Sequence, residues 1–523
     1  MALSNTQTYA ASGTGTPVDW SVNGVLGGNA SVGTITAQGV YTAPASFPGI
    51  GLNTFAITAT SKANSAVTAA ASATAVYPND TSTAQTAPIK LGTSGSNVNS
   101  VAAGATACCV GTLGALMNRS GTLFVLSNQH VLTNGGAGTV GDAINQPGPA
   151  ACFAGPNVVA NFSEGFVEPL SGTTGPATDN VDAALAQVAA GQVDTTGSIL
   201  DLGAAGGNSI AAAPPSSTTA PESVGLNIAK SGRTTGLTCS TVSSILTTVT
   251  VDYDSACGGP VGFNSTFTNQ IIVDNTGGSF ASPGDSGALI VTRDQARPVG
   301  LLFAGTSTTA VANPIRDVIS AFTVQSVPKQ IPGIVGGADH AVSCAPAATV
   351  PSGNPNGTFS TLVPALAKVA KVSVAEQQRV DRARQAQELL LTLDPMVNSV
   401  AVAASEDAPG EGALEIHVSG ATQNPIPPLI NGVRTKVIFE GLGPAPAFTQ
   451  MDVDHARTVK ETHVASLLGQ PGIQGVGVSA SKDNPAETAV VIYVIKGMTH
   501  PPIPAVLDGV RTQIVEGERF RAF

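Results

Sequence analysis

The segment GDSGALIV places a serine, Ser286, between two glycines and directly before a short apolar stretch. A serine hydroxyl becomes a useful nucleophile when a base removes its proton and when small neighbours leave Oγ open to a substrate carbonyl. Gly284 and Gly287 meet the second need, and they permit a tight backbone that would aim the amides of Gly284 and Ser286 at a developing oxyanion. An ordinary glycine turn is the alternative. The pattern favours acyl transfer.

A base for this serine is available in LFVLSNQHVL, where an apolar strand runs into a polar turn that carries His130. It is the only histidine between residues 101 and 323. An isolated histidine is most simply bonded to neighbouring backbone. The glycine-framed serine reverses that preference, because an imidazole is the commonest general base for a hydroxyl nucleophile.

A carboxylate that could orient the imidazole lies in DNVDAALAQV, where Asp182 opens an apolar run. A carboxylate at a strand end can accept the Nδ1 proton, fix the tautomer and stabilise the imidazolium that forms. Asp179 competes for this role, and a solvated loop acid is the alternative for either residue. The chain order is therefore His, Asp, Ser.

At these residues the sequence resembles the trypsin-like serine peptidases of the chymotrypsin fold, over residues 101–323. The likeness includes LSNQHVL at 126, NVDAALA at 180, KSGRTTGLT at 230, SPGDSGALIV at 282 and PVGLLFAG at 298. Together these segments resemble a bacterial branch that is also similar to the plant narrow-leaf proteases. The resemblance implies two six-stranded antiparallel barrels, with His130 as general base, Asp182 as its partner, Ser286 as nucleophile, and the Gly284 and Ser286 amides as oxyanion hole.

The resemblance also raises the question of activation. In zymogen-type relatives the residue equivalent to Asp285 pairs with a newly cut amino terminus, whereas a turn acid bonded to local amides is the simpler interpretation here. The segment IVGG at 334–337 is similar to such a terminus, but it follows Ser286, so we interpret it as coincidence.

The residues before and after the nucleophile predict the substrate pocket. Phe280 lies where an acidic pocket floor would be expected, and Phe303 and Ala304 belong to the apolar wall segment GLLFAGTS. We therefore expect uncharged side chains of small or medium size before the scissile bond.

Six cysteines, with no CxxC pair, favour disulfides over a zinc site. Cys239 and Cys257 flank an alternating segment that would fold as a hairpin, so pairing them would join its ends. Cys152 could then bond Cys108 or Cys109. No metal or organic cofactor is expected.

The outer regions differ in kind from the middle. Residues 1–78 alternate short β-branched segments with Gly-rich turns and resemble bacterial immunoglobulin-like domains, with Trp20 as a core residue. Residues 361–523 carry 31 of the 57 charged residues and contain an internal repeat, in which Val400–Ile416 aligns with Val476–Ile492. Each copy opens with a helical pattern followed by alternating segments, which predicts two α+β, ferredoxin-like units.

Composition limits the partners. The net charge of −11, the pI near 4.9 and the absence of a basic stripe argue against nucleic acid. No apolar run approaches the roughly 18 residues of a membrane span. Few charges (11%) with 59 Gly and 35 Pro favour turn-rich β structure. Secretion or a bacterial cell-surface location is inferred from composition, although no signal segment is visible.

The sequence thus predicts a mainly β, multidomain serine endopeptidase that acts on polypeptides. The expected divisions are an immunoglobulin-like sandwich (1–78), a linker (79–100), the protease domain (101–323), a linker (324–360) and two repeats (361–449 and 450–523). Two other functions remain open: an inactive protease scaffold that binds or assembles, and an esterase with the same triad. The repeats are candidates for a chaperone, an inhibitor or a homo-oligomer contact.

Overall fold

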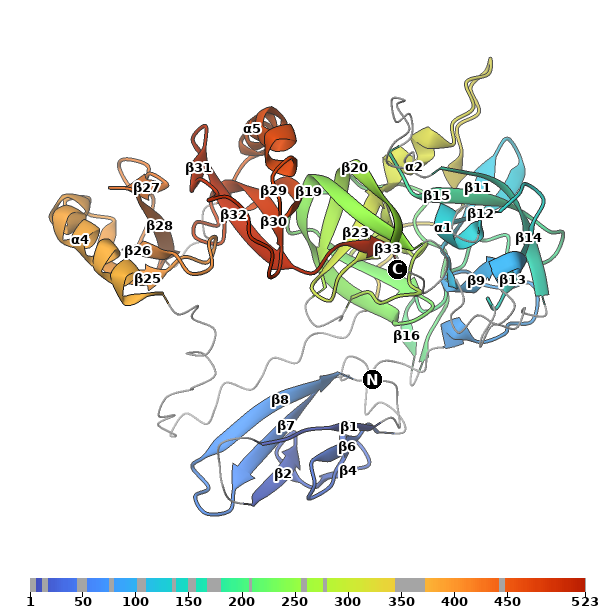
Figure 1. Cartoon of the computed structure of the whole chain (residues 1–523). Helices are drawn as coiled ribbons and strands as arrows, with labels where there is room; N and C mark the ends of the chain where they lie inside the picture. Colours follow the sequence, from blue (N-terminus) through green and yellow to red (C-terminus); the bar gives the residue numbers. More distant parts are fainter. Residues whose placement is uncertain are drawn as a thin grey trace.

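The computed structural model describes residues 6–522 apart from 12–16, 45–53, 75–79, 101–109, 134–137, 149–156, 167–179, 207–208, 255–260, 276–279, 344–371 and 442–446. Strands dominate these residues, as the sequence predicts (Figure 1). The described helices are α1 (Gln129–Leu132), α2 (Ile315–Ala321), α4 (Val374–Leu391), α5 (Gln450–Leu468) and the 3-10 turns η1 (Asp80–Ser82) and η2 (Val98–Ser100).

The first 74 residues contain two four-stranded antiparallel sheets, in the orders β1-β6-β5-β4 and β3-β2-β7-β8. Their strands are β1 (Thr6–Thr8), β2 (Val18–Val22), β3 (Val25–Leu26), β4 (Gly28–Asn29), β5 (Gly33–Ile35), β6 (Val40–Thr42), β7 (Thr54–Ser61) and β8 (Thr68–Thr74). Trp20 and Phe55 from one sheet and Tyr41 from the other share a single core. Trp20 is therefore a core residue, and the immunoglobulin-like topology stays a prediction.

The histidine and aspartate segments belong to an antiparallel sheet in the order β10-β9-β13-β14-β15-β12-β11-β24. Its strands are β9 (Thr93–Asn97), β10 (Gly111–Leu113), β11 (Ala115–Arg119), β12 (Thr122–Ser127), β13 (Ala143–Gln146), β14 (Asn157–Phe166), β15 (Ala183–Val188) and β24 (Gly333–Ile334). Only Gly114 separates β10, at one end of this order, from β11, the last strand but one, so the chain itself brings the two sides of the sheet together. The IVGG segment contributes Ile334 to β24, which pairs with Met117 as an edge strand.

The serine segment belongs to a second ring of strands, in which β18-β21-β22-β23-β20-β19 follow in order and β18 pairs again with β19. These strands are β18 (Asn227–Gly232), β19 (Gly236–Asp254), β20 (Val261–Asp274), β21 (Leu289–Thr292), β22 (Pro298–Gly305) and β23 (Thr309–Pro314), and a small hairpin of β16 (Ala205–Gly206) and β17 (Ser209–Ile210) precedes them. The ring closes because each strand has partners on both edges. Its long strand β19 reaches beyond the ring.

The two repeats share one order of strands, β25-β26-β28-β27 and β29-β30-β32-β31. Their bounds are β25 (Val397–Ala404), β26 (Gly412–Val418), β27 (Leu429–Ile430), β28 (Val433–Phe439), β29 (Ile473–Ala480), β30 (Thr488–Ile495), β31 (Val506–Leu507) and β32 (Val510–Gly517). Within the described residues each copy has one helix, and its central pair is parallel. A ferredoxin-like unit has the order β-α-β-β-α-β. The repeats are α+β as predicted, but the described copies differ from that finer expectation.

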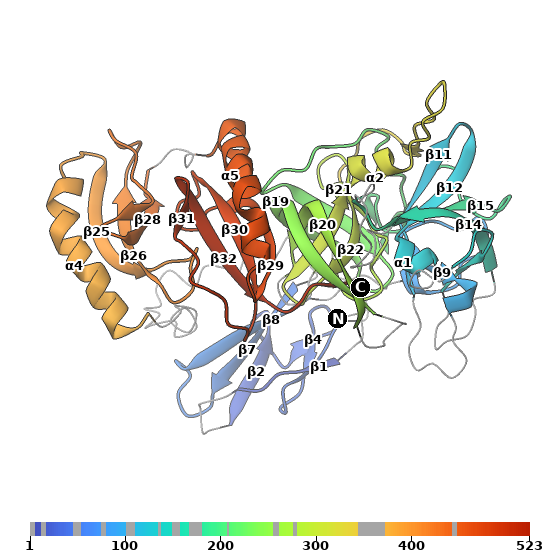
Figure 2. The same cartoon turned by 45° about the horizontal axis from the view of Figure 1, so that its top comes forward.

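The second repeat is continuous with the ring that contains β19. β29 pairs antiparallel with β19, from Ser244 opposite Ser479 to Val249 opposite Gly475, and Figure 2 shows β29 and β30 beside β19. The last described strand, β33 (Arg521–Ala522), returns from this repeat to β19 and β22. The sequence did not indicate this continuity.

Two arginines join the repeats to each other. The Arg434 guanidinium donates to the Thr512 carbonyl at 2.8 Å, and that of Arg511 donates to the Thr435 carbonyl at 2.7 Å. Both side chains are almost fully buried. Each guanidinium also forms an ion pair with a partly exposed glutamate of its own copy, Arg434 with Glu411 at 2.8 Å and Arg511 with Glu487 at 2.5 Å. The two arginines thus form a reciprocal contact between the copies.

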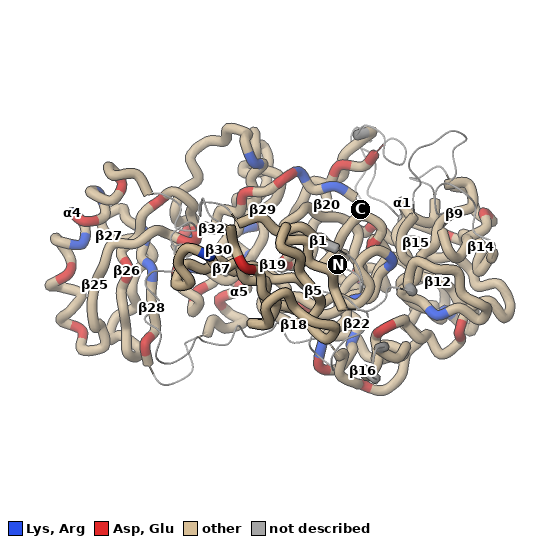
Figure 3. Tube along the Cα trace, turned by 90° about the horizontal axis from the view of Figure 1, so that it is seen from below, with Lys and Arg blue, Asp and Glu red and all other residues tan. Residues whose placement is uncertain are grey.

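Charged side chains are sparse along the trace, and Lys and Arg are interspersed with Asp and Glu in the view of Figure 3. In the described part of the chain, no helix is long and apolar enough to cross a membrane.

Candidate active site

His130 is presented by the short helix α1, which follows β12 directly. The neighbouring side chains of Val131 and Leu132 are buried in the core, so the helix is fixed by packing. The Thr133 hydroxyl donates to the carbonyl of Gln129 at 2.7 Å. The His130 side chain keeps 13% exposure. The apolar strand followed by a polar turn in the sequence thus holds the imidazole at the end of β12.

Asp182 lies at the entry to β15 and is completely buried. Its carboxylate accepts hydrogen bonds from His130 Nδ1 at 2.6 Å, from the Tyr253 hydroxyl at 2.8 Å and from the amide of Gln129 at 2.7 Å. Its own amide donates to Asn313 Oδ1 at 3.1 Å, and its carbonyl accepts from Asn313 Nδ2 at 3.1 Å. The backbone and the carboxylate are therefore both fixed. The competing residue, Asp179, lies outside the described residues.

Tyr253, from the far end of β19, is a site residue that sequence reasoning missed. Its ring stacks on Phe263 with centroids 4.9 Å apart and meets the His130 ring edge-on at 6.0 Å. Burial, together with the charge of Asp182, raises the pKa of Tyr253 well above its ordinary value, so the hydroxyl stays a donor. A tyrosine in an alternating strand is usually interpreted as a core residue, and no local sequence pattern connects Tyr253 to Asp182.

Tyr253→Phe is expected to destabilise the protein by about 1.5–3 kcal/mol, because it removes one hydrogen bond to a buried carboxylate. The acidic limb of the pH–rate profile should move to higher pH, because the less satisfied carboxylate holds the imidazolium more strongly. Denaturant unfolding and hydrolysis rates measure the two effects. Tyr493→Phe is the matched control, since the buried Tyr493 hydroxyl, from β30, bonds the neutral hydroxyl of Ser244 on β19 instead of a carboxylate. An unchanged profile in Tyr253→Phe would contradict the assignment.

Ser286 occupies the tight turn that precedes β21. Gly284 and Gly287 flank it with φ values of +99° and +91°, which only glycine adopts readily. A methyl group added at Gly287 would also lie 2.2 Å from the Thr112 carbonyl oxygen. The Ser286 carbonyl accepts from the amide of Thr112 at 2.7 Å, and its hydroxyl donates to the carbonyl of Phe303 at 3.1 Å. Both glycines are therefore required by this backbone, as the motif predicts.

The serine turn and α1 both adjoin β10. A methyl group at Gly111 would lie 2.4 Å from Val131 Cγ2 and 2.9 Å from the Ser286 carbonyl oxygen. The structure thus places the serine turn and α1, which come from two different sheets, close to the same glycine. The oxyanion role of the Gly284 and Ser286 amides stays a prediction.

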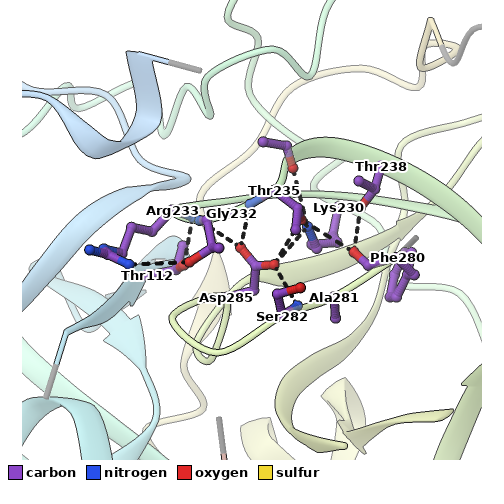
Figure 4. A network of polar contacts seen from close by, with 12 residues as sticks. Thr112, Lys230, Gly232, Arg233, Thr235, Thr238, Phe280, Ala281, Ser282 and Asp285 are labelled. Carbon is purple, nitrogen blue, oxygen red and sulfur yellow. Dashed lines mark hydrogen bonds and ion pairs between the residues drawn. The ribbon is translucent and has the colours of Figure 1, made fainter. Parts of the chain in front are cut away.

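Asp285, next to Ser286, is completely buried in a network of donors (Figure 4). Its carboxylate accepts from the amides of Ser282, Thr234 and Thr235 at 3.0, 2.8 and 3.1 Å, and from the Thr235 hydroxyl at 2.7 Å. Lys230 Nζ lies 3.5 Å from the same carboxylate. Asp285 is therefore bonded to local amides, as expected for a turn acid. The positive charge near it is the ammonium of Lys230.

Lys230 itself is fully buried in β18. Its Nζ donates to the carbonyl of Gly236 at 3.2 Å and to the Thr235 hydroxyl, and it lies 5.6 Å from the centre of the Phe280 ring. Burial lowers the pKa of Lys230, and the charge of Asp285 opposes that shift. This lysine belongs to the segment KSGRTT, but a lysine in a predicted strand does not indicate that its side chain is buried.

The three predicted pocket residues all have buried side chains. Phe303 and Ala304 share one apolar cluster with Tyr253, and Phe280 belongs to another. The Phe303 ring packs on Phe267 with centroids 4.9 Å apart. Phe303 contacts Ser286 through its carbonyl. The pocket stays a prediction.

Cys239 lies on β19 and is disulfide-bonded. Its expected partner, Cys257, and the second expected pair, Cys152 with Cys108 or Cys109, lie outside the described residues. Among the described residues, no cluster of three His, Cys, Asp or Glu side chains could hold a metal ion.

A family model described as the Nal1 C-terminal domain matches residues 213–313. That span contains Tyr253 and Ser286 but neither His130 nor Asp182. No curated protein matches the chain.

Among solved structures, a glutamic acid specific serine protease that uses a histidine triad in substrate binding is 18% identical, with 46% of this chain and 100% of that chain covered and a TM-score of 0.31. Protease A of Thermobifida fusca is 16% identical, with 48% and 99% covered and a TM-score of 0.30. A Nocardiopsis protease is 16% identical, with 42% and 92% covered and a TM-score of 0.28. These are bacterial serine proteases of the chymotrypsin fold, similar to this chain at low identity and over less than half its length.

Proposed function

We propose that the chain is a serine endopeptidase that hydrolyses peptide bonds through His130, Asp182 and Ser286. The observation that carries the proposal is the 2.6 Å hydrogen bond from His130 Nδ1 to a buried carboxylate with two further donors. Such a contact fixes the tautomer in which Nε2 carries the lone pair that accepts a proton. The glycine-framed turn of Ser286 supplies the nucleophile.

In the proposed cycle, Ser286 Oγ attacks a peptide carbonyl while its proton passes to His130 Nε2. Asp182 stabilises the imidazolium, and the amides of Gly284 and Ser286 donate to the oxyanion. The amine leaves with the proton from His130, and water hydrolyses the acyl-enzyme. Apart from the substrate and this water, each step uses only side chains and amides of this chain.

The proposal extends to the setting of the enzyme. Residues 101–323 would carry catalysis, behind an immunoglobulin-like unit, in a bacterial protein that is secreted or held at the cell surface. The substrate would be a polypeptide with an uncharged side chain before the scissile bond, and the repeats would be the site of any homo-oligomer contact. Composition and motif resemblance support these points.

A fluorophosphonate probe tests the nucleophile. After prolonged incubation of the full chain, we expect one covalent adduct, located at Ser286 by peptide mass mapping. Ser286→Ala should give no adduct, and Ser282→Ala, a change in the same loop, should be labelled normally. A folded protein that never reacts would favour an inactive binding or assembly scaffold. Comparing matched amide and ester substrates then separates a peptidase from an esterase.

A further inference from the structure

One edge of β22 has three successive neighbours. β21 pairs with β22 as far as Leu301. The serine turn comes next, because the Ser286 hydroxyl donates to the carbonyl of Phe303. β33 then pairs with Ala304 and Gly305, while β23 occupies the opposite edge over the same residues. The carboxyl-terminal segment therefore lies on the edge that the nucleophile shares.

The direction of β33 leads toward the nucleophile. Arg521 lies opposite Gly305, and Ala522 lies opposite Ala304, in antiparallel register. Each step along β33 is thus a step back along β22 toward Phe303. An extended peptide that paired with this edge would gain main-chain hydrogen bonds and would present its next carbonyl beside Ser286. Residue 523 lies outside the described residues.

Several contacts from the second repeat and from β19 hold this segment in place. Phe520 is almost fully buried, and its ring meets that of Tyr493 with centroids 5.7 Å apart. The Phe520 carbonyl accepts from the amide of Asp252 at 2.9 Å, and its amide donates to Gln474 Oε1 at 3.1 Å. Gln474 Nε2 donates to the carbonyl of Glu518 at 2.7 Å. The segment is thus anchored two residues before it reaches Ala304.

The nucleophile is covered in this arrangement, since Ser286 has 0% exposure in the whole chain. A substrate that needs the β22 edge must displace β33. We propose that residues 518–522 are a built-in inhibitor that holds the substrate strand position of β22, an inference that rests on the proposed function. The second repeat anchors this inhibitor, which gives the repeat a role in control of the site.

A tethered segment competes at an effective concentration in the millimolar range. A substrate or probe at micromolar concentration therefore meets a site that is mostly occupied. Removal of the segment should raise the rate of probe labelling and peptide hydrolysis at least about tenfold.

The first test compares the full chain with a chain that ends at Gly517, which keeps β32 and removes residues 518–523. We expect faster fluorophosphonate labelling of Ser286 in the shortened chain. R521P/A522P is the second variant: it keeps Phe520 and removes two main-chain donors from β33, so it should show the same gain. Glu516→Ala is the matched control, because Glu516 is exposed on β32 and lies outside the proposed inhibitor segment. Measurable labelling of Ser286 at equal rates in the full chain and both variants would overturn the proposal.

A binding measurement keeps this inference separate from the proposed function. The probe is a fluorescent peptide with the sequence of residues 517–522, GERFRA, added to Ser286→Ala protein with and without residues 518–523. We expect binding to the shortened chain to be at least about tenfold tighter, and no binding of a scrambled peptide. If no form of the protein labels at Ser286 but the peptide binds in this way, the proposed function fails and the occupied edge stands. Equal binding to both chains would refute the inhibitor.

Discussion

Asp182→Asn is expected to lower peptide hydrolysis by about 10⁴-fold without unfolding the protein. The carboxylate accepts from the His130 imidazole, the Tyr253 hydroxyl and the Gln129 amide. Asparagine has one acceptor oxygen, so its amide group must face one of these donors. When it faces His130, it donates to Nδ1 and moves the proton to Nε2, which can then no longer accept from Ser286. The fold survives because Asn313 holds the backbone of residue 182 on both sides.

The same experiment decides between the two acids that the sequence offers. Asp179→Asn should keep turnover within a few-fold of the wild type, measured as kcat/KM on one peptide under identical conditions. Circular dichroism and the midpoint of denaturant unfolding check that both variants are folded. Turnover that survives in Asp182→Asn, or that is lost only in Asp179→Asn, would show that the orienting carboxylate was assigned wrongly.

The sequence predicted the parts of the site whose signal is local. The turn of Ser286 needs two glycines at positive φ, and the motif GDSG contains both of them. His130 follows an apolar strand, and Asp182 precedes one. Asp182 was preferred to Asp179 because it opens an apolar run. The contacts that its carboxylate makes with His130 and Tyr253 involve residues that are distant along the chain.

What the sequence could not predict depends on pairing across long separations. Tyr253 and Lys230 are ordinary strand residues until β19 and β18 are folded around the site. Two of these pairings join segments more than 200 residues apart, Arg521 with Gly305 and Ser244 with Ser479. The sequence of either segment does not indicate which strand it pairs with. The buried guanidinium of Arg434 has one acceptor, Glu411, in its own repeat and another, the Thr512 carbonyl, in the other repeat, and the second contact could not be predicted from one copy.

The buried pair of Lys230 and Asp285 predicts the largest effect on stability. Lys230→Met should reduce the free energy of unfolding of the ring that contains β18 by about 3–5 kcal/mol, because it leaves the Asp285 charge buried without its cationic partner. The amides of Ser282, Thr234 and Thr235 remain as donors, so the acid is still hydrogen-bonded and the turn can form. The carboxylate holds the residue next to Ser286, so probe labelling should also slow.

Two further variants separate charge from packing. K230M/D285N removes both charges and should recover most of the lost stability, because a buried pair that is replaced as a unit costs little. Arg297→Met breaks the half-exposed pair with Asp339 and should cost no more than about 1 kcal/mol. Hydrogen exchange of the β18 and β21 amides is the appropriate measurement. The only tryptophan, Trp20, lies in the core of the first two sheets, so its fluorescence follows a different part of the chain. If Lys230→Met and Arg297→Met weaken β18 equally, the ammonium does not stabilise the turn that carries the nucleophile.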